Sequence, residues 1–272
     1  MSSLVKRHPL VTFFALALAI SWCVLPFGAF LPFGPLVAAL VVIAITDGKA
    51  GLRRLGGRLT RWRLGWQWYA MAVGVPLTVH LFAIGSNVGL GAAAPSLDQF
   101  SAWYSIFMVI GITMINPLNG PMGEEPGFRG FAQPSLQARR SPLQATAILA
   151  GVVALWHLPL FLIPEFELAP IELLATVAVT FWYAWLFNRT GGSVLITLLA
   201  HATEGGINTD DLWPDGTFAT RETWLFVLGW VLVAAALLVF DRKTWTAAPN
   251  TAPGTAEPSP ADEPSTQSAA HR

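Results

Sequence analysis

The chain has 272 residues, of which 54% are hydrophobic and 12% are charged, and its formal net charge is zero. Soluble domains carry about 25% charged residues, so this composition excludes an ordinary water-soluble domain. The chain has neither a basic domain nor the interleaved aromatic and basic residues that nucleic acid requires, which argues against nucleic acid as a partner. Cys23 is the only cysteine, so an intrachain disulfide and a CxxC-type site are excluded.

Apolar stretches that could cross a membrane recur along the chain as far as residue 240. A transmembrane helix needs about 20 mostly apolar residues. We therefore predict an all-α fold, a polytopic transmembrane helical bundle of about eight spans, whose second span is short. The spans are expected at residues 10–31, 33–46, 67–92, 102–122, 143–164, 170–188, 193–213 and 223–240.

The first span follows Lys6 and Arg7, as the apolar part of a signal peptide would. However, the small-residue pair Ala17 and Ala19 lies inside the apolar run, which continues to Phe30. A cleavage site would come after such a run, so we expect a retained transmembrane helix.

The composition changes from Thr244 onward to Ala, Pro, Thr, Ser and Glu without apolar periodicity. Such a segment cannot build a packed core. We therefore predict two parts, a transmembrane helical domain over residues 1–243 and a disordered cytoplasmic tail over residues 244–272.

The charged residues of the loops segregate by sign, and lysine and arginine in short loops mark the cytoplasmic side. With eight alternating spans, the basic loop residues share one side, and Arg221 is the only basic residue on the other. The basic set is Lys6, Arg7, Lys49, Arg53, Arg54, Arg58, Arg61, Arg63, Arg139, Arg140, Arg189, Arg242 and Lys243, and the opposite loops hold Asp98, Glu165, Glu167, Asp210, Asp211 and Asp215. We expect a multi-pass protein of the plasma membrane with both termini in the cytoplasm.

Six of these basic residues lie within residues 49–63. We interpret the run as an orienting cytoplasmic loop that lies on anionic lipid; a specific lipid or partner site is the alternative.

Polar residues at membrane depth form three clusters. Glu124 and Glu125 end the fourth predicted span with Arg129 one turn later, His157 lies in the fifth span, and His201 lies in the seventh. A charge within the bilayer costs at least about 2.5–3.5 kcal/mol on insertion scales, so such residues usually mark function.

The adjacent carboxylates are expected to do different work, because neighbours on a helix point about 100° apart. The spacing of Glu125 and Arg129 allows an ion pair, which would leave Glu124 free to face a cavity as a general base. The structural alternative is an interfacial charge cluster.

A single membrane histidine is usually an interhelical hydrogen bonder, and we interpret His80 in that way. His157 and His201 differ because both lie on odd-numbered spans, and the two helices that carry them can converge with the helix of the Glu pair on one cavity.

Other protease signatures are absent from the sequence. None of the five histidines is followed by glutamate, so there is no H-E-x-x-H zinc motif. There is no G-x-S-x-G element for a serine nucleophile, and no aspartate stands in the middle of a predicted span.

The glutamate motif at residues 123–131 resembles E-E-x-x-x-R of the CAAX protease and bacteriocin-processing family, which includes the type II CAAX prenyl endopeptidases. Residues 156–159, Trp-His-Leu-Pro, resemble its second motif, F-x-x-x-H, and residues 201–203 begin its third, H-x-x-x-N or D. The resemblance covers a family core of about residues 100–210.

The chain departs from the family pattern at two positions. Val153 stands where the second motif has an aromatic residue, and Gly205 stands where the third motif has an amide or carboxylate. Glu204 and Asn208 lie near the same helix face and are the candidates to substitute. Gly205 and Gly206 could also unwind the helix.

The resemblance implies proteolysis inside the membrane, from a cavity open to the cytoplasmic side. Carried over to this chain, it makes Glu124 the residue that activates a water molecule with help from His157. Glu125 and Arg129 would orient the site, and His201 would stabilise the oxyanion.

Two mechanisms stay open at this point. Glu124, His157 and His201 could fill three zinc positions and leave the fourth for water, or glutamate and histidine could activate water alone. We favour no obligatory metal.

The sequence thus predicts an intramembrane endopeptidase that acts on a membrane-associated peptide or protein substrate. A non-catalytic membrane binding or bacteriocin-immunity type of protein is the alternative, favoured by Gly205. A proton-relaying transporter would show paired repeats or matched broken helices, which the sequence lacks.

Overall fold

The computed structural model describes residues 2–100, 102–163 and 168–249, and every regular element within these ranges is helical, which confirms the all-α class. The α-helices are α1 (Ser2–Arg7), α2 (Pro9–Trp22), α3 (Gly34–Thr46), α4 (Gly48–Leu59), α5 (Trp66–Gly89), α6 (Ser105–Ile115), α7 (Pro121–Gly127), α8 (Gln133–Gln137), α9 (Pro142–His157), α10 (Glu172–Arg189), α11 (Val194–Glu204), α12 (Gly216–Phe240) and α13 (Arg242–Thr246). Shorter elements are η1 (Leu25–Phe27), η2 (Leu97–Phe100), the π-helix η3 (Phe128–Ala132), η4 (Leu158–Leu162) and η6 (Asp210–Leu212).

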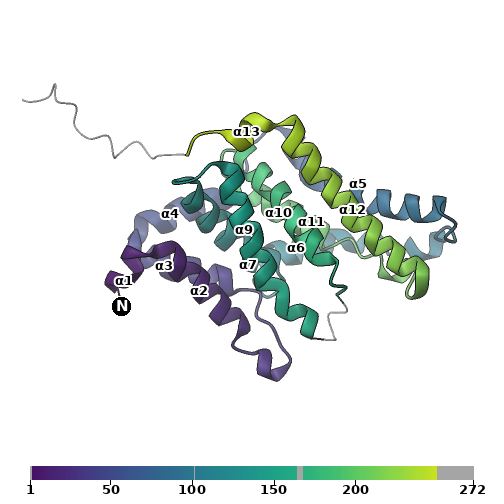
Figure 1. Ribbon diagram of the computed structural model, residues 1–272, viewed down its shortest axis with the longest axis horizontal. Coiled ribbons are helices and arrows are strands. Elements are labelled where there is room, and N and C mark those ends of the chain that lie inside the picture. The colour runs from purple at the N-terminus through teal and green to yellow at the C-terminus, as the bar shows by residue number, and fades with distance from the viewer. Residues whose placement is uncertain (1, 101, 164–167, 250–272) are drawn as a thin grey trace, which may run out of the picture.

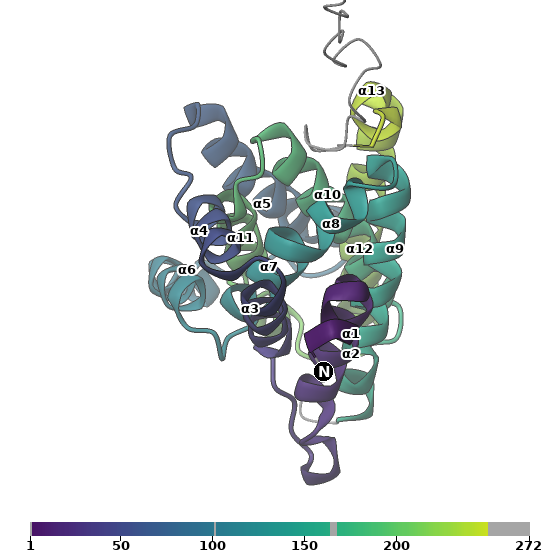
Figure 2. The same ribbon diagram turned by 90° about the vertical axis from the view of Figure 1, so that its left-hand side faces the viewer.

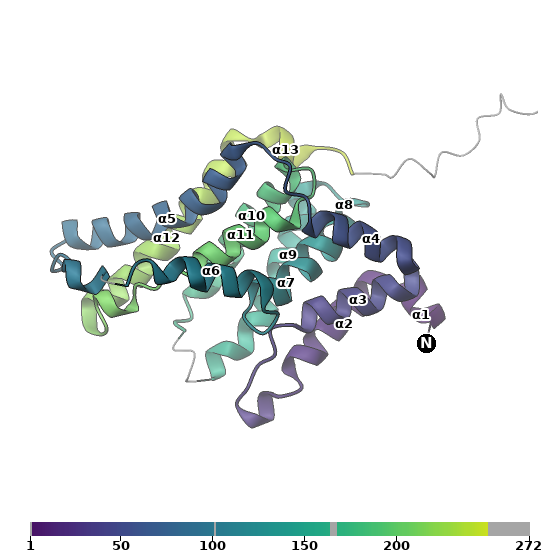
Figure 3. The ribbon, with the colours of Figure 1, turned by 180° about the vertical axis from the view of Figure 1, so that it is seen from behind.

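The bundle has two flanks with a central group of helices between them (Figure 1). On one flank α5 and α12 lie side by side, and on the other α2 pairs with α3, as the view from behind also shows (Figure 3). Buried Trp182 and Trp230 belong to the hydrophobic cluster of the first flank, and Phe13 and Trp156 belong to that of the second. The central helices divide between the two clusters: α10 and α11 contribute to the first, and α9 contributes to the second.

Four helical segments in the described residues are long and apolar enough to cross a membrane: Pro9–Phe27, Trp66–Gly89, Pro142–Phe161 and Gly216–Phe240. They coincide with the first, third, fifth and eighth predicted spans. These four segments confirm a membrane-type helical bundle, whereas a count of eight spans is not confirmed.

The outer face of α12 is as apolar as its packed face. Val227 and Trp230 are buried against neighbouring helices, while Leu228 and Leu232 are exposed. A helix that is hydrophobic all round needs protein on one side and another apolar medium on the other. Hydrocarbon is the medium that fits the exposed leucines.

The expected continuous fourth span, 102–122, was wrong. Helix α6 ends at Ile115, a turn follows, and α7 begins at Pro121. Asn116 precedes Pro117 and has extended backbone angles (φ −93°, ψ 111°), as a residue before proline prefers. Its side-chain oxygen accepts a hydrogen bond from the backbone N–H of Leu118, and Gly120 has a positive φ of 62°. The turn is therefore locally encoded.

The seventh expected span, 193–213, is also shorter than predicted. Helix α11 has 11 residues, which corresponds to about 16 Å, against a hydrocarbon core of about 30 Å. Its C-cap is Gly205, and Gly205 and Gly206 were the residues expected to unwind the helix. Helix α3 is likewise short, with 13 residues.

The predicted domain boundary at residue 243 falls inside α13. Trp245 is buried, its ring lies against Phe181, and its indole N–H donates to the carbonyl of Leu237. This packing holds residues 244–246 in the helix, so the folded part extends beyond the predicted start of the tail. Residues 250–272 of the predicted tail lie outside the described residues.

Candidate active site

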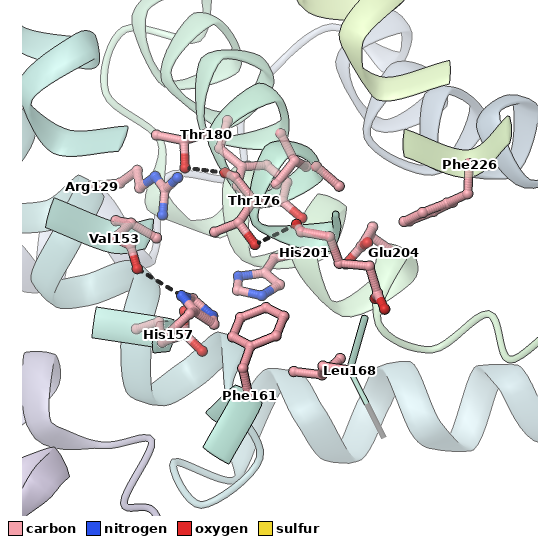
Figure 4. Close-up of a pocket in the computed structure, with 15 residues that line it drawn as sticks. Arg129, Val153, His157, Phe161, Leu168, Thr176, Thr180, His201, Glu204 and Phe226 are labelled. Carbon is pink, nitrogen blue, oxygen red and sulfur yellow. Dashed lines mark hydrogen bonds between the residues drawn. The ribbon is translucent and has the colours of Figure 1, made fainter. Parts of the chain in front are cut away.

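A cavity of about 150 Å³ lies among the central helices and is lined by residues from all three sequence motifs. Glu124, Arg129, His157 and His201 contribute to its wall, and Figure 4 shows the last three around it. These residues come from α7, η3, α9 and α11. The tertiary structure thus brings together side chains that are up to 77 positions apart in the sequence (201 − 124).

Helix α7 lies between α3 and α11 (Figure 2), and its glycines explain how close it can approach α3. A Cβ atom on Gly123 would lie 2.6 Å from the carbonyl oxygen of Pro32, and one on Gly127 would lie 2.4 Å from that of Pro35. Both distances are far below van der Waals contact, so only glycine fits at either position. This close approach buries Glu124 and Glu125 between the glycines.

Glu125 links the first and third motifs. Its Oε1 accepts hydrogen bonds from Arg129 Nη1 and from His201 Nδ1, each with a donor–acceptor distance of 3.0 Å. Glu125 is fully buried and Arg129 is 1% exposed. The expected pairing of Glu125 with Arg129 is confirmed, and the histidine is a partner that the sequence did not reveal.

Tyr183 of α10 contacts both side chains that are hydrogen-bonded to Glu125, namely His201 and Arg129. Its ring stacks on the imidazole of His201, with centroids 5.1 Å apart and planes 23° apart. The guanidinium of Arg129 lies 5.0 Å from the centroid of the same ring, a cation–π distance. Tyr183 therefore restricts the orientation of both His201 and Arg129.

His157 has a defined tautomer if its ring is neutral. Its Nδ1–H donates to the backbone carbonyl of Val153 over 2.9 Å, so the lone pair of Nε2 is left to face the cavity. The preceding residue, Trp156, donates its indole N–H to Ser21 Oγ over 2.8 Å. This bond anchors the end of α9 on α2 and thereby fixes the backbone position of His157.

The π-helix η3 carries Arg129. Such single-turn insertions often occur at functional sites because they redirect one side chain. Arg58 of α4 donates to the carbonyl of Gly130 in this turn. Burial, and then the neighbouring charges of Arg54 and Arg61, lower the pKa of Arg58.

The two candidates to replace the third-motif residue are in different places. Glu204 lines the cavity, whereas Asn208 is exposed and is not part of the cavity wall. Gly205 caps the end of α11 and has no side chain to offer. His80, interpreted as structural, is buried beside Phe226 with ring centroids 4.9 Å apart and is likewise not part of the wall.

Sequence reasoning missed the contribution of α10. Glu172, Thr176, Thr180 and Tyr183 all line the cavity. Their spacing of four, four and three residues is that of one helix face, and they are polar positions in the part of α10 that precedes Asn188 and Arg189. That stripe is the signal that would have identified them.

The sequence allowed zinc as a cofactor, and the positions of the possible ligand side chains show whether they fit a zinc site. Within the described ranges, no three His, Cys, Asp or Glu side chains are placed so that they could share a metal ion. The residues as arranged do not fit a three-ligand zinc site.

Comparison with known families identifies the segment that carries these residues. Residues 101–205 match the family described as type II CAAX prenyl endopeptidase Rce1-like. No curated protein matches the chain. The matched segment contains the glutamate motif, His157 and His201. Residues 101–205 are therefore similar to the CAAX protease family.

Proposed function

We propose that this protein is an intramembrane endopeptidase that hydrolyses a peptide bond of a membrane-associated substrate with water activated by Glu124 and His157. The observation that carries the proposal is the convergence of Glu124, His157 and His201 on one cavity within a bundle of apolar helices. The family match supports protease activity. A lipid bilayer and a membrane-associated peptide or protein are the expected partners.

In this mechanism Glu124 accepts a proton from a water molecule that is also hydrogen-bonded to Nε2 of His157. The water oxygen forms a bond to the carbonyl carbon of the substrate, and the carbonyl oxygen becomes an oxyanion. Collapse of this intermediate breaks the C–N bond, and the proton on Glu124 passes to the leaving nitrogen. General acid–base catalysis of this kind contributes about 10²–10⁴-fold in rate.

His201 is the proposed oxyanion donor. Its Nδ1–H is held by Glu125, so Nε2 can donate to the oxyanion only when the ring carries both protons. Arg129 adds positive charge at the same wall of the cavity. Its Nε and Nη2 have no hydrogen-bond partner in the described part of the chain. Both groups act where negative charge develops.

We also propose a plasma-membrane location with both termini in the cytoplasm. The support is the segregation of lysine and arginine to one set of loops. This assignment requires that α2 with α3 return the chain to the cytoplasmic side, and that α6 with α7 carry it from the opposite face back to the cytoplasmic side.

Cleavage by the purified protein in lipid vesicles tests the proposal. Quenched fluorescent peptides with a membrane anchor should be hydrolysed by wild type, and Glu124→Gln should reduce kcat by at least about 100-fold. His8→Gln and Asp215→Asn, at exposed positions on other elements, are the matched controls. Equal cleavage by wild type and Glu124→Gln would show that Glu124 is not the base.

The alternative is a non-catalytic membrane binding protein of the same family, as a bacteriocin-immunity function would require. The specific observation in its favour is Gly205, which leaves the third motif without its usual side chain. Wild-type protein that binds membrane peptides but cleaves none of them would favour this alternative.

A further inference from the structure

One end of the cavity carries two carboxylates that the proposed chemistry does not use. Glu172 and Glu204 line this end together with Phe161, Leu168 and Phe226. In Figure 4, Glu204 lies between His201 and Phe226, on the side away from His157 and Arg129. Among the described residues of the wall, Arg129 is the only lysine or arginine, and it is bound to Glu125. This end of the cavity is both acidic and apolar.

The carboxylates differ in their contacts. Glu172 Oε1 accepts a hydrogen bond from the backbone N–H of Ala169 over 2.8 Å, at the start of α10. For the carboxylate of Glu204, no hydrogen bond or ion pair occurs within residues 2–100, 102–163 and 168–249. The charges that act on it are the attractive one of His201 and the repulsive ones of Glu124 and Glu172.

Tyr183 supplies a second, independent sign of a ligand. It lines the same cavity and is 2% exposed, yet its buried hydroxyl has no hydrogen-bond partner among the described residues. Glu204 is the strongest of the charges that act on this hydroxyl. A buried hydroxyl and a carboxylate without partners in one cavity leave two polar groups for an occupant to satisfy.

A carboxylate beside apolar side chains is costly unless a cation or a hydrogen-bond donor pairs with it. A metal ion is a poor candidate, because no three metal-ligating side chains in the described ranges are suitably placed. An organic cation on an apolar stem fits better. Its methylene groups would contact Leu168 and Phe161, and its charge would lie near Glu204 and the ring of Phe226.

The size and place of this end suit a substrate side chain. The cavity volume of about 150 Å³ is roughly ten times what a single water molecule requires. Glu204 follows His201 by three residues on α11, a rise of about 4.5 Å. An extended peptide advances about 3.3–3.6 Å per residue. The side chain that reaches Glu204 therefore belongs to a residue within one or two positions of the bond that His201 faces.

We infer that Glu204 is a specificity-determining residue that binds the ammonium or guanidinium group of a substrate lysine or arginine next to the scissile bond. This inference rests on the proposed endopeptidase function and names its substrate class. It assigns Glu204 to substrate selection rather than to the oxyanion.

A peptide series tests the inference. Membrane-anchored peptides that differ at one position beside the scissile bond carry lysine, norleucine, which matches the lysine stem without the charge, or glutamate. With wild-type protein in vesicles, kcat/KM for lysine should exceed that for norleucine by about 10- to 100-fold. Glu204→Gln should bring this ratio toward one, and Glu204→Lys should make glutamate the preferred residue.

Two further variants sharpen the result. Phe226→Leu removes the ring but keeps an apolar side chain, so it should lower the lysine-to-norleucine ratio by less than Glu204→Gln does. Asn208→Ala is exposed and not part of the wall, and it should keep the wild-type ratio. Equal cleavage of the lysine and norleucine peptides by wild type, or an unchanged ratio in Glu204→Gln, overturns the inference.

Binding of the same peptides to Glu124→Gln separates this inference from the proposed function. If wild type cleaves nothing, but Glu124→Gln binds the lysine peptide preferentially and an added Glu204→Lys reverses that order, the subsite stands and proteolysis is wrong. If peptides are cleaved without any charge preference, proteolysis stands and the subsite is wrong. Neither cleavage nor preferential binding overturns both.

Discussion

His201 donates its Nδ1–H to the carboxylate of Glu125, 76 positions earlier in the chain, over 3.0 Å. The same oxygen accepts from Arg129, so one buried carboxylate holds the third motif against the first. Both glutamates are buried, but only Glu124 lines the cavity, so the pair divides into a positioning residue, Glu125, and a proposed base, Glu124.

Removing Glu125 should destabilise the protein as well as inactivate it. Glu125→Ala leaves the Arg129 guanidinium buried without its partner, which costs about 3–5 kcal/mol. Thermal unfolding in detergent measures this loss. The double variant Glu125→Ala/Arg129→Met removes both charges and should recover much of the stability without recovering activity. A double variant no more stable than Glu125→Ala would contradict a buried ion pair.

The glycines of α7 should not tolerate even one methyl group. Gly127→Ala places a Cβ against the Pro35 carbonyl, and we expect a loss of about 1–3 kcal/mol from overpacking. Gly123→Ala should behave in the same way. Gly151→Ala in α9 is the matched control, since its Cβ would meet open space, and it should be neutral or stabilising by about 0.4–1 kcal/mol.

Exhaustive chelation tests the metal question. Because the described His and acidic side chains do not form a three-ligand set, we expect activity to survive chelation and the purified protein to lack stoichiometric zinc. Loss of activity that added zinc restores would instead show that the site rearranges around a metal.

A substitution at position 205 should increase the rate of peptide cleavage. A Cβ at Gly205 would have an ordinary contact, 3.6 Å from the carbonyl of His201, and the backbone there has a negative φ of −73°. Gly205→Asn would place an amide one turn after His201, and a regained oxyanion donor is worth about 100- to 1000-fold in rate. We expect Gly205→Asn to accelerate cleavage and Gly205→Ala, which lacks the amide, to have no such effect.

Asn208 separates the two explanations for the third motif. Because its side chain is exposed and not part of the cavity wall, Asn208→Ala should cleave peptides at the wild-type rate. A loss of 100-fold or more in Asn208→Ala would mean that the end of α11 unwinds to bring Asn208 to the substrate.

Reporter fusions test the topology. Fusions after Thr46, Arg140 and Arg189 should report the cytoplasm, and fusions near Pro95 and Asp215 should report the opposite face, because basic loops remain on the cytoplasmic side. An inverted pattern at two or more of these sites would refute the proposed orientation.

Features that depend on residues close together in the chain could be predicted from the sequence alone. The four long apolar segments could be predicted because crossing a membrane requires a continuous apolar run. The Glu125–Arg129 pair could be predicted because helix geometry brings residues four apart together. The break between α6 and α7 was missed, although Asn116, Pro117 and Gly120 encode it locally.

Which distant side chains share the cavity depends on how the helices pack, and the sequence alone did not predict it. The sequence offered both Glu204 and Asn208 as candidates for the third motif, and of these two only Glu204 lies in the cavity wall. The contact of His201 with Glu125 and its stacking on Tyr183 join α11 to α7 and α10. Helix periodicity fixes which residues share a face, but the packing of one helix on another fixes what that face meets.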